Sequence, residues 1–173
     1  MNTELALASP MSSNSSAHVD RVASAYPHFV HLRMHSEYSI VDGLVRIDDV
    51  VKAAVKDKQA ALALTDLGNL FGLVKFYKAT RGKGIKPVAG CDVWITNDND
   101  RDKPSRLLLL VKSRHGYLRL CELLARAWLE NQHRGRAEIK FEWLQELFEN
   151  DSEQGLIALS GAHFGDVGIA IDN

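Results

Sequence analysis

The sequence predicts an α/β fold with a mainly parallel sheet. Short apolar segments alternate along the chain with longer segments whose apolar residues recur at helical spacing, which is the pattern of β-α units. The segment 106–112, RLLLLVK, contains an unbroken apolar run at 107–111, which is typical of a strand buried on both faces of a sheet. The last expected strand is followed only by the start of a helix near residue 165, so a barrel would be unfinished and we expect a longer parent chain.

Each expected element follows from local periodicity and from turn residues. Alternation in FVHLRM places His31 and Arg33 on one face of a first strand. The five expected strands lie at 29–34, 61–65, 86–95, 106–112 and 155–161. Helices are expected at 46–59, 70–82, 117–131, 140–150 and from 165 onward, with loops at 96–105 and 131–139. The helix 117–131 is the clearest, with an expected apolar stripe of Leu118, Cys121, Leu124, Ala125 and Trp128.

Composition limits the class of protein. The chain has 173 residues, of which 46% are hydrophobic and 25% charged, enough for one domain with a core. A net charge of -1 excludes a strongly basic molecule but leaves a local basic patch open. Cys91 and Cys121 lie far apart, which argues against a disulfide framework or a zinc finger and fits a reducing cytoplasm. No apolar run approaches the roughly 20 residues of a membrane helix, so no membrane partner is expected.

Two regions are expected. Residues 1–27 are rich in Ser, Ala and Asn and lack the pattern of a signal peptide, so we expect a disordered leader. Residues 28–173 then form the N-terminal part of a folded domain. The chain contains neither GxGxxG nor GxxxxGK[ST], so neither a dinucleotide site nor a P-loop is supported.

The residues that suggest chemistry lie after strands. In parallel α/β folds, functional groups gather where strands end, which selects His35, Asp66, Asp92 and His163, together with Asp42 in the first loop. Histidine and carboxylates converging from separate strands would suit divalent metals. Each also has a structural interpretation, because an Asp before Gly often forms a turn and an Asp after a strand often caps one.

Five segments in order resemble one known family. HLRMHSEYSIVDG, ALALTDLGNLFGLVKFYKA, GIKPVAGCDVWI, LLLLVKSRHGYLRLCELLARAW and GLIALSG resemble the PHP domain at the start of the alpha subunit of bacterial DNA polymerase III. The resemblance covers about residues 28–173 and implies a distorted (β/α)7 barrel, incomplete in this chain. Active members of the family hold up to three metal ions and hydrolyse phosphoesters, a chemistry in which metal activates water.

The resemblance also implies which positions would ligate metal. Two of the seven match, one is a conservative change, and four are lost. His35 and Asp42 match, and Asp92 replaces a Glu. The lost positions are Arg33 for the first His of His-x-His, Leu67 for the His that follows Thr65-Asp66, Arg106 for a strand-opening His, and Ala162 for a Cys or His.

Arginine at two of these positions suggests that charge replaces metal. A guanidinium stays protonated and cannot ligate a cation. We therefore expect Arg33 or Arg106 to form ion pairs with Asp42 or Asp92, and we expect no zinc or manganese at this site. His31 precedes the motif and is not a ligand.

Three functions remain open. The first is a metal-free scaffold within a replicative polymerase, which docks the proofreading exonuclease subunit; the parent chain would bind DNA and deoxynucleotides and use Mg²⁺ and carboxylates further downstream. The second is an active metal-dependent phosphoesterase, either a 3'-5' exonuclease or a pyrophosphatase, with one metal held by His35, Asp42, Asp66 and Asp92. The third is a stand-alone adaptor.

Overall fold

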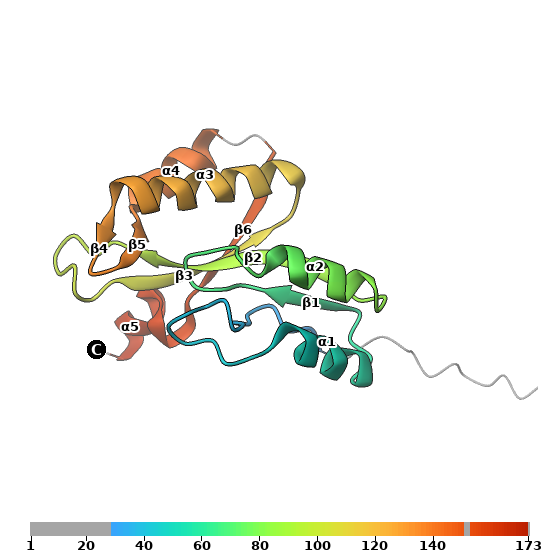
Figure 1. Cartoon of the computed structure of the whole chain (residues 1–173). Coiled ribbons are helices and arrows are strands. Elements are labelled where there is room, and N and C mark those ends of the chain that lie inside the picture. Colours follow the sequence, from blue (N-terminus) through green and yellow to red (C-terminus); the bar gives the residue numbers. More distant parts are fainter. Residues whose placement is uncertain (1–28, 151–152, 173) are drawn as a thin grey trace, which may run out of the picture.

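The computed structural model describes residues 29–150 and 153–172, so the expected leader at 1–27 lies outside the described residues. The α/β class is confirmed (Figure 1). The strands are β1 Ala61–Leu64, β2 Lys86–Ile95, β3 Ser105–Val111, β4 Gln132–His133, β5 Arg136–Ile139 and β6 Leu156–Ser160. The helices are α1 Ile47–Lys56, α2 Leu73–Arg81, α3 Arg114–Glu130, α4 Phe141–Asn150 and α5 Asp166–Asp172, with a 3-10 turn, η1, at Ala162–Phe164.

The sheet is mixed, so the expectation of a mainly parallel sheet is wrong. Strand β2 pairs in parallel with β1 and then with β5 along one edge, and antiparallel with β3 along the other. Strand β6 is antiparallel to β3, and β4 to β5. The reason lies between β2 and β3, where residues 96–104 form no helix, and a parallel pair would need a long crossover. In the described residues the sheet stays open, in the order β4-β5-β2-β3-β6.

Two local expectations also fail. No strand forms at 29–34; the carbonyls of His31 and Met34 each accept one backbone hydrogen bond, from Ala63 N and Thr65 N, which is too little for a regular ladder. The expected loop 131–139 instead contains the hairpin β4–β5. Its turn is Arg134-Gly135, with φ of 49° and 78°, as a tight two-residue hairpin turn requires.

Two apolar clusters hold the layers together. One lies between the sheet and the helices α3 and α4, which lie above it in Figure 1, and includes Cys91, Leu109, Leu120 and Ile139. The other joins α1 and α2 to β1 through Ile47, Leu62 and Phe76, among others. None of the described helices combines the length and apolarity required to cross a membrane.

Helix α3 buries a different face from the one that its sequence suggested. Its buried apolar side chains are Leu120, Leu123, Leu124 and Ala127. Of the expected stripe only Leu124 is buried, while Leu118 is 50% and Trp128 40% exposed. Apolar residues occur on both faces of this helix, so periodicity alone cannot select the core face.

Candidate functional site

The candidate site lies in the gap between two strands, β1 and β5, that pair with the same edge of β2. Strand β1 pairs with β2 as far as Ala89, and β5 begins to pair at Trp94. Between them Leu67 forms an isolated parallel bridge with Asp92, whose side chain is fully buried. The chain that follows β1 therefore runs directly past Asp92.

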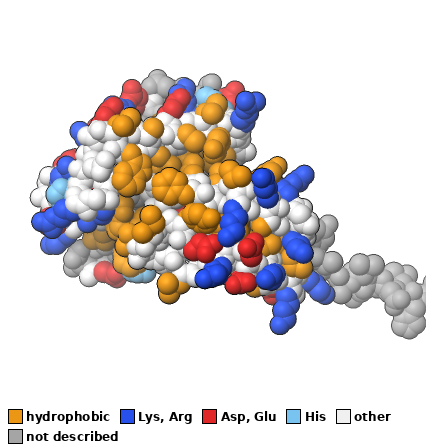
Figure 2. All heavy atoms as spheres, viewed as in Figure 1, with side chains coloured by type: hydrophobic (Ala, Val, Ile, Leu, Met, Phe, Trp, Pro, Cys, Tyr) orange, Lys and Arg blue, Asp and Glu red, His pale blue; other side chains and the backbone are white. Residues whose placement is uncertain are grey.

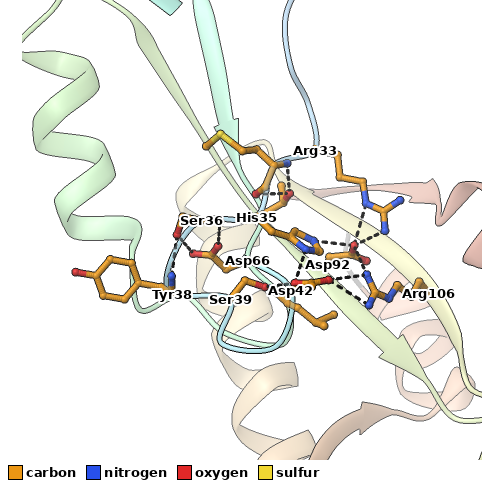
Figure 3. A network of polar contacts seen from close by, with 12 residues as sticks. Arg33, His35, Ser36, Tyr38, Ser39, Asp42, Asp66, Asp92 and Arg106 are labelled. Carbon is orange, nitrogen blue, oxygen red and sulfur yellow. Dashed lines mark hydrogen bonds and ion pairs between the residues drawn. The ribbon is translucent and has the colours of Figure 1, made fainter. Parts of the chain in front are cut away.

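Two arginines converge on the Asp92 carboxylate (Figure 3). Arg33 donates from Nε and Nη2 to Oδ2 of Asp92, at 2.9 and 2.5 Å. Arg106 Nη1 lies 3.5 Å from the same oxygen, and its Nη1 and Nη2 lie 3.4 Å from Oδ2 of Asp42. The ion pairs that the sequence suggested between these arginines and carboxylates are present in the structure.

His35 bridges the two carboxylates. Its Nδ1 lies 2.9 Å from Asp42 Oδ1 and its Nε2 lies 3.0 Å from Asp92 Oδ2. Burial alone lowers the pKa of His35, but the hydrogen bonds and negative charges of Asp92 and Asp42 outweigh it and raise the pKa above its ordinary value. An imidazolium donates from both nitrogens, so the protonated ring satisfies both contacts.

A tight turn presents Asp42. Ser39 donates from Oγ to Asp42 Oδ1 at 2.8 Å and accepts from Leu67 N at 3.0 Å. Partial burial raises the pKa of Asp42, but the Ser39 hydrogen bond and the charges of His35 and Arg106 outweigh it and lower the pKa. Gly43 is required because an added Cβ would lie 1.7 Å from the carbonyl oxygen of Ser36. The Asp-Gly turn expected from the sequence is therefore also a device that holds a site carboxylate.

Aromatic rings hold the guanidinium of Arg106 in place. Trp94 is its cross-strand partner in the β2–β3 register, and the guanidinium carbon lies 4.3 Å from the centre of the Trp94 ring and 5.3 Å from that of Phe164. The residue that follows β6 supplies an acceptor for the other arginine, since Gly161 O lies 3.4 Å from Arg33 Nη1. These aromatic and backbone partners depend on strand register, which local periodicity does not give.

Three of the other expected positions lie beside the cluster, and their side chains form no hydrogen bond or ion pair with it. Asp66 is buried and accepts from Ser36, at 2.6 Å from the backbone N and 2.9 Å from Oγ. Burial raises the pKa of Asp66 despite these two hydrogen bonds. Leu67 bridges to Asp92 through its backbone, and Ala162 begins η1 with a φ of 53°. The Ser36–Asp66 pair was not expected from the sequence.

The donor set does not fit a divalent metal. Two guanidinium groups and a histidine surround two carboxylates, and a guanidinium offers no lone pair. Within residues 29–150 and 153–172, no group of three or more His, Cys, Asp and Glu side chains is arranged to hold a metal ion. Asp92 Oδ1 and Arg106 Nε are buried without a hydrogen-bond partner, so the cluster leaves one polar atom of each residue unsatisfied.

Comparison with known proteins agrees with the motif pattern. The PHP domain family matches residues 31–173. This chain belongs to the PHP domain family. Its relatives include the DNA polymerase III subunit alpha of Neisseria meningitidis serogroup A, 47% identical over 85% of this chain and 13% of the relative. Those of Pseudomonas aeruginosa and Escherichia coli K12 are 45% and 44% identical, over 83% and 82% of this chain and 12% of each relative.

The PHP-family chain thus spans about an eighth of the length of these curated relatives. Among solved structures, an amidohydrolase from Chromobacterium violaceum matches with a TM-score of 0.45 and 23% identity, over 57% of this chain and 32% of that one. A metal-dependent phosphoesterase from Bifidobacterium adolescentis matches with a TM-score of 0.42 and 14% identity, over 59% of this chain and 32% of that one.

Proposed function

We propose that this chain is the PHP-domain portion of the alpha subunit of a replicative DNA polymerase III. In this proposal the parent chain performs DNA-templated DNA synthesis in the bacterial cytoplasm, with Mg²⁺ and carboxylates outside these residues. The portion described is a metal-free scaffold that docks the proofreading exonuclease subunit. Relatives at 44–47% identity support the assignment of the parent chain.

One observation carries the scaffold role. Arg33 and Arg106 occupy positions that the family resemblance assigns to metal ligands, and both guanidinium groups lie on the carboxylate of Asp92. The two guanidinium groups stay protonated, so they place two positive charges where active members of the family hold metal ions. A divalent cation would have to enter against their repulsion.

Metal content of the parent chain tests this proposal. The protein is purified without chelator, offered excess zinc and manganese, desalted and subjected to elemental analysis. The scaffold proposal expects no ion retained at this site, and an Asp92→Asn variant should give the same content as the wild type. One or more ions held by the wild type and absent from Asp92→Asn would overturn it.

The alternative is a weak one-metal phosphoesterase. His35 and Asp42 keep their positions, and Asp92 keeps its charge. Manganese-dependent release of a 3'-terminal nucleotide, or hydrolysis of pyrophosphate, would favour this function if His35→Ala abolished it while primer extension continued. Absence of both activities at millimolar manganese is the result that the scaffold proposal expects.

An apolar groove is the surface that best suits a docked polypeptide. It has a volume of about 720 Å³ and runs between the exposed face of α3 and the residues that follow β1. Its lining includes Phe71, Trp94, Tyr117, Cys121 and Trp128. Aromatic side chains of this kind are enriched at protein interfaces. By contrast, Arg101 in the polar loop 96–104 already binds Asn131 and buried Glu138, which ties that loop to the hairpin.

Cys121 reports directly on this groove. It is half-buried and lines the groove, whereas Cys91 is fully buried and burial raises the pKa of its thiol. Alkylation of Cys121 in the parent chain, followed by peptide mass spectrometry, should slow when the exonuclease subunit is added. Unchanged labelling in a complex that still forms would place docking elsewhere, and full protection before any subunit is added would show that the parent chain itself covers the groove.

A further inference from the structure

The β1–α2–β2 unit brings one set of cations to one end of the molecule. Because β1 and β2 are parallel, the connecting helix α2 runs back and ends where β2 begins. Helix α1 ends there too, since only four residues separate it from β1. The register pairs Ala61 with Lys86, and Lys86 N donates to Ala60 O at 2.8 Å. The ends of both helices therefore meet the starts of both strands.

Six cations and one acid occupy this end. Residues 56–60 and 78–86 contain only Asp57 as an acid, and the cations are Lys56, Lys58, Lys78, Arg81, Lys83 and Lys86. All six are exposed, and within the described part of the chain none forms an ion pair. Figure 2 shows Lys and Arg side chains gathered over this α1–α2 end. We name these six residues the cationic end; it stands out in a chain whose net charge is -1.

Helix dipoles explain only part of this concentration of positive charge. Lys56, Lys78 and Arg81 lie in the last turns of α1 and α2, where positive charge is favoured. Lys58, Lys83 and Lys86 lie outside both helices. Lys58 even adopts a φ of 55°, which a lysine seldom does. A solvated face needs no such concentration of one sign of charge, so the surplus indicates a partner.

We propose that the cationic end binds the phosphate backbone of double-stranded DNA. Exposed cationic side chains that form no ion pair within the described residues suit sequence-independent contact with phosphates, which releases counterions. The two stretches contain no aromatic residue, whereas single strands are usually gripped by stacking on aromatic rings. This inference rests on the proposed function, because a polymerase brings duplex DNA to the domain, and it assigns a DNA contact to this part of the chain.

The test uses the parent chain and a labelled primer-template with a long duplex arm. The variant K58N/K83Q/K86Q removes three charges outside the helices, and Asn tolerates the positive φ at position 58. The matched control K103Q/K112Q/K140Q removes three exposed lysines elsewhere. Dissociation constants are measured by anisotropy between low and moderate salt. We expect the slope of log K against log salt to become shallower by about 0.9 for each phosphate that the protein no longer neutralises, only in the first variant.

The outcomes separate this inference from the proposed function. The inference would be overturned if wild type and K58N/K83Q/K86Q gave the same slope of log K against log salt. It would also be overturned if both triple variants weakened DNA binding equally. A weakening that is as large on a single-stranded template as on the duplex would also overturn it. Primer extension on a short duplex is measured in parallel; if the wild type cannot extend a primer, the proposed function fails, whatever the slopes show. Thermal unfolding of both variants controls for folding.

Discussion

Arg33 places two donors on a single oxygen of Asp92, a carboxylate with no exposed surface. The Arg33 side chain is 30% exposed, whereas that of Asp92 is fully buried. His35, from the same segment as Arg33, and Arg106, from β3, contact the same oxygen. Asp92 is therefore the centre of the cluster, because three basic side chains contact its one buried carboxylate oxygen.

Replacing Arg33 by alanine should destabilise the complete PHP domain. Loss of one partner from a buried pair typically costs about 3–5 kcal/mol, but Arg106 and His35 remain, so we expect about 1–3 kcal/mol. Thermal unfolding measures the change. The control is Lys52→Ala, which breaks an exposed helical pair with Asp49 and should cost less than about 1 kcal/mol. An unchanged melting temperature in Arg33→Ala would contradict charge replacement.

Arg33 and Asp92 should also be coupled energetically. Asp92→Asn leaves Arg33, Arg106 and His35 facing one another without their shared counter-charge, and Arg33→Met leaves the carboxylate under-compensated. The double variant R33M/D92N removes the uncompensated charge that each single variant leaves. Its loss of stability should therefore be smaller than the sum of the two single losses by about 0.5–3 kcal/mol. Strict additivity in a denaturant cycle would show that the contact is incidental.

Stability should fall as the pH rises through the titration of His35. The folded-state pKa of His35 lies above its ordinary value of 6.5, so its contribution is complete below 6.5 and is lost as the pH rises through the higher folded value. Unfolding of the wild type between pH 5.5 and 8, the interval in which histidine titrates, is compared with that of His35→Gln. The variant should lose this part of the pH dependence; an identical dependence would assign it to other groups.

The site was easier to predict than the sheet around it. His35, Asp42 and Asp92 were selected by residue type and by their positions around the expected strands, Arg33 and Arg106 were selected through the family resemblance, and the structure brings all five together. Their contacts join basic side chains to carboxylates, and the sequence shows directly which residues carry these groups. The mixed sheet depends on how residues 96–104 turn, and apolar runs are the same in parallel and antiparallel strands.

Other features needed the tertiary structure itself. Trp94 stacks on Arg106 because the β2–β3 register places the two opposite each other. The hairpin β4–β5 escapes sequence reasoning because its strands are short and polar, although Arg134-Gly135 is a turn signal. In α3, the sequence assigns to the core an apolar face that instead lines the groove, because burial by a neighbouring element is not encoded in the period of one helix.

Asp66 should behave as a structural residue. It accepts two hydrogen bonds from Ser36, and an asparagine can replace it by accepting from the backbone N and donating to Oγ. Asp66→Ala leaves the buried N–H of Ser36 without a partner and should cost about 1–3 kcal/mol, whereas Asp66→Asn should cost much less. Thermal unfolding of the two variants tests this role. Equal losses in both would show that the negative charge of Asp66 is itself required.

Restoring histidines should restore metal binding, if arginines took the place of metal. The variant R33H/L67H/R106H returns imidazole to three positions that the family resemblance assigns to ligands, beside His35, Asp42 and Asp92. Imidazole and carboxylate together suit zinc. We expect this variant to retain zinc or manganese and to melt at a higher temperature with metal than with chelator, while the wild type shows neither effect. The matched variant R33Q/L67Q/R106Q removes the same guanidinium groups without adding imidazole. If it retained as much metal as the histidine variant, binding would owe nothing to the restored ligands, and the arginines would have excluded metal by charge alone.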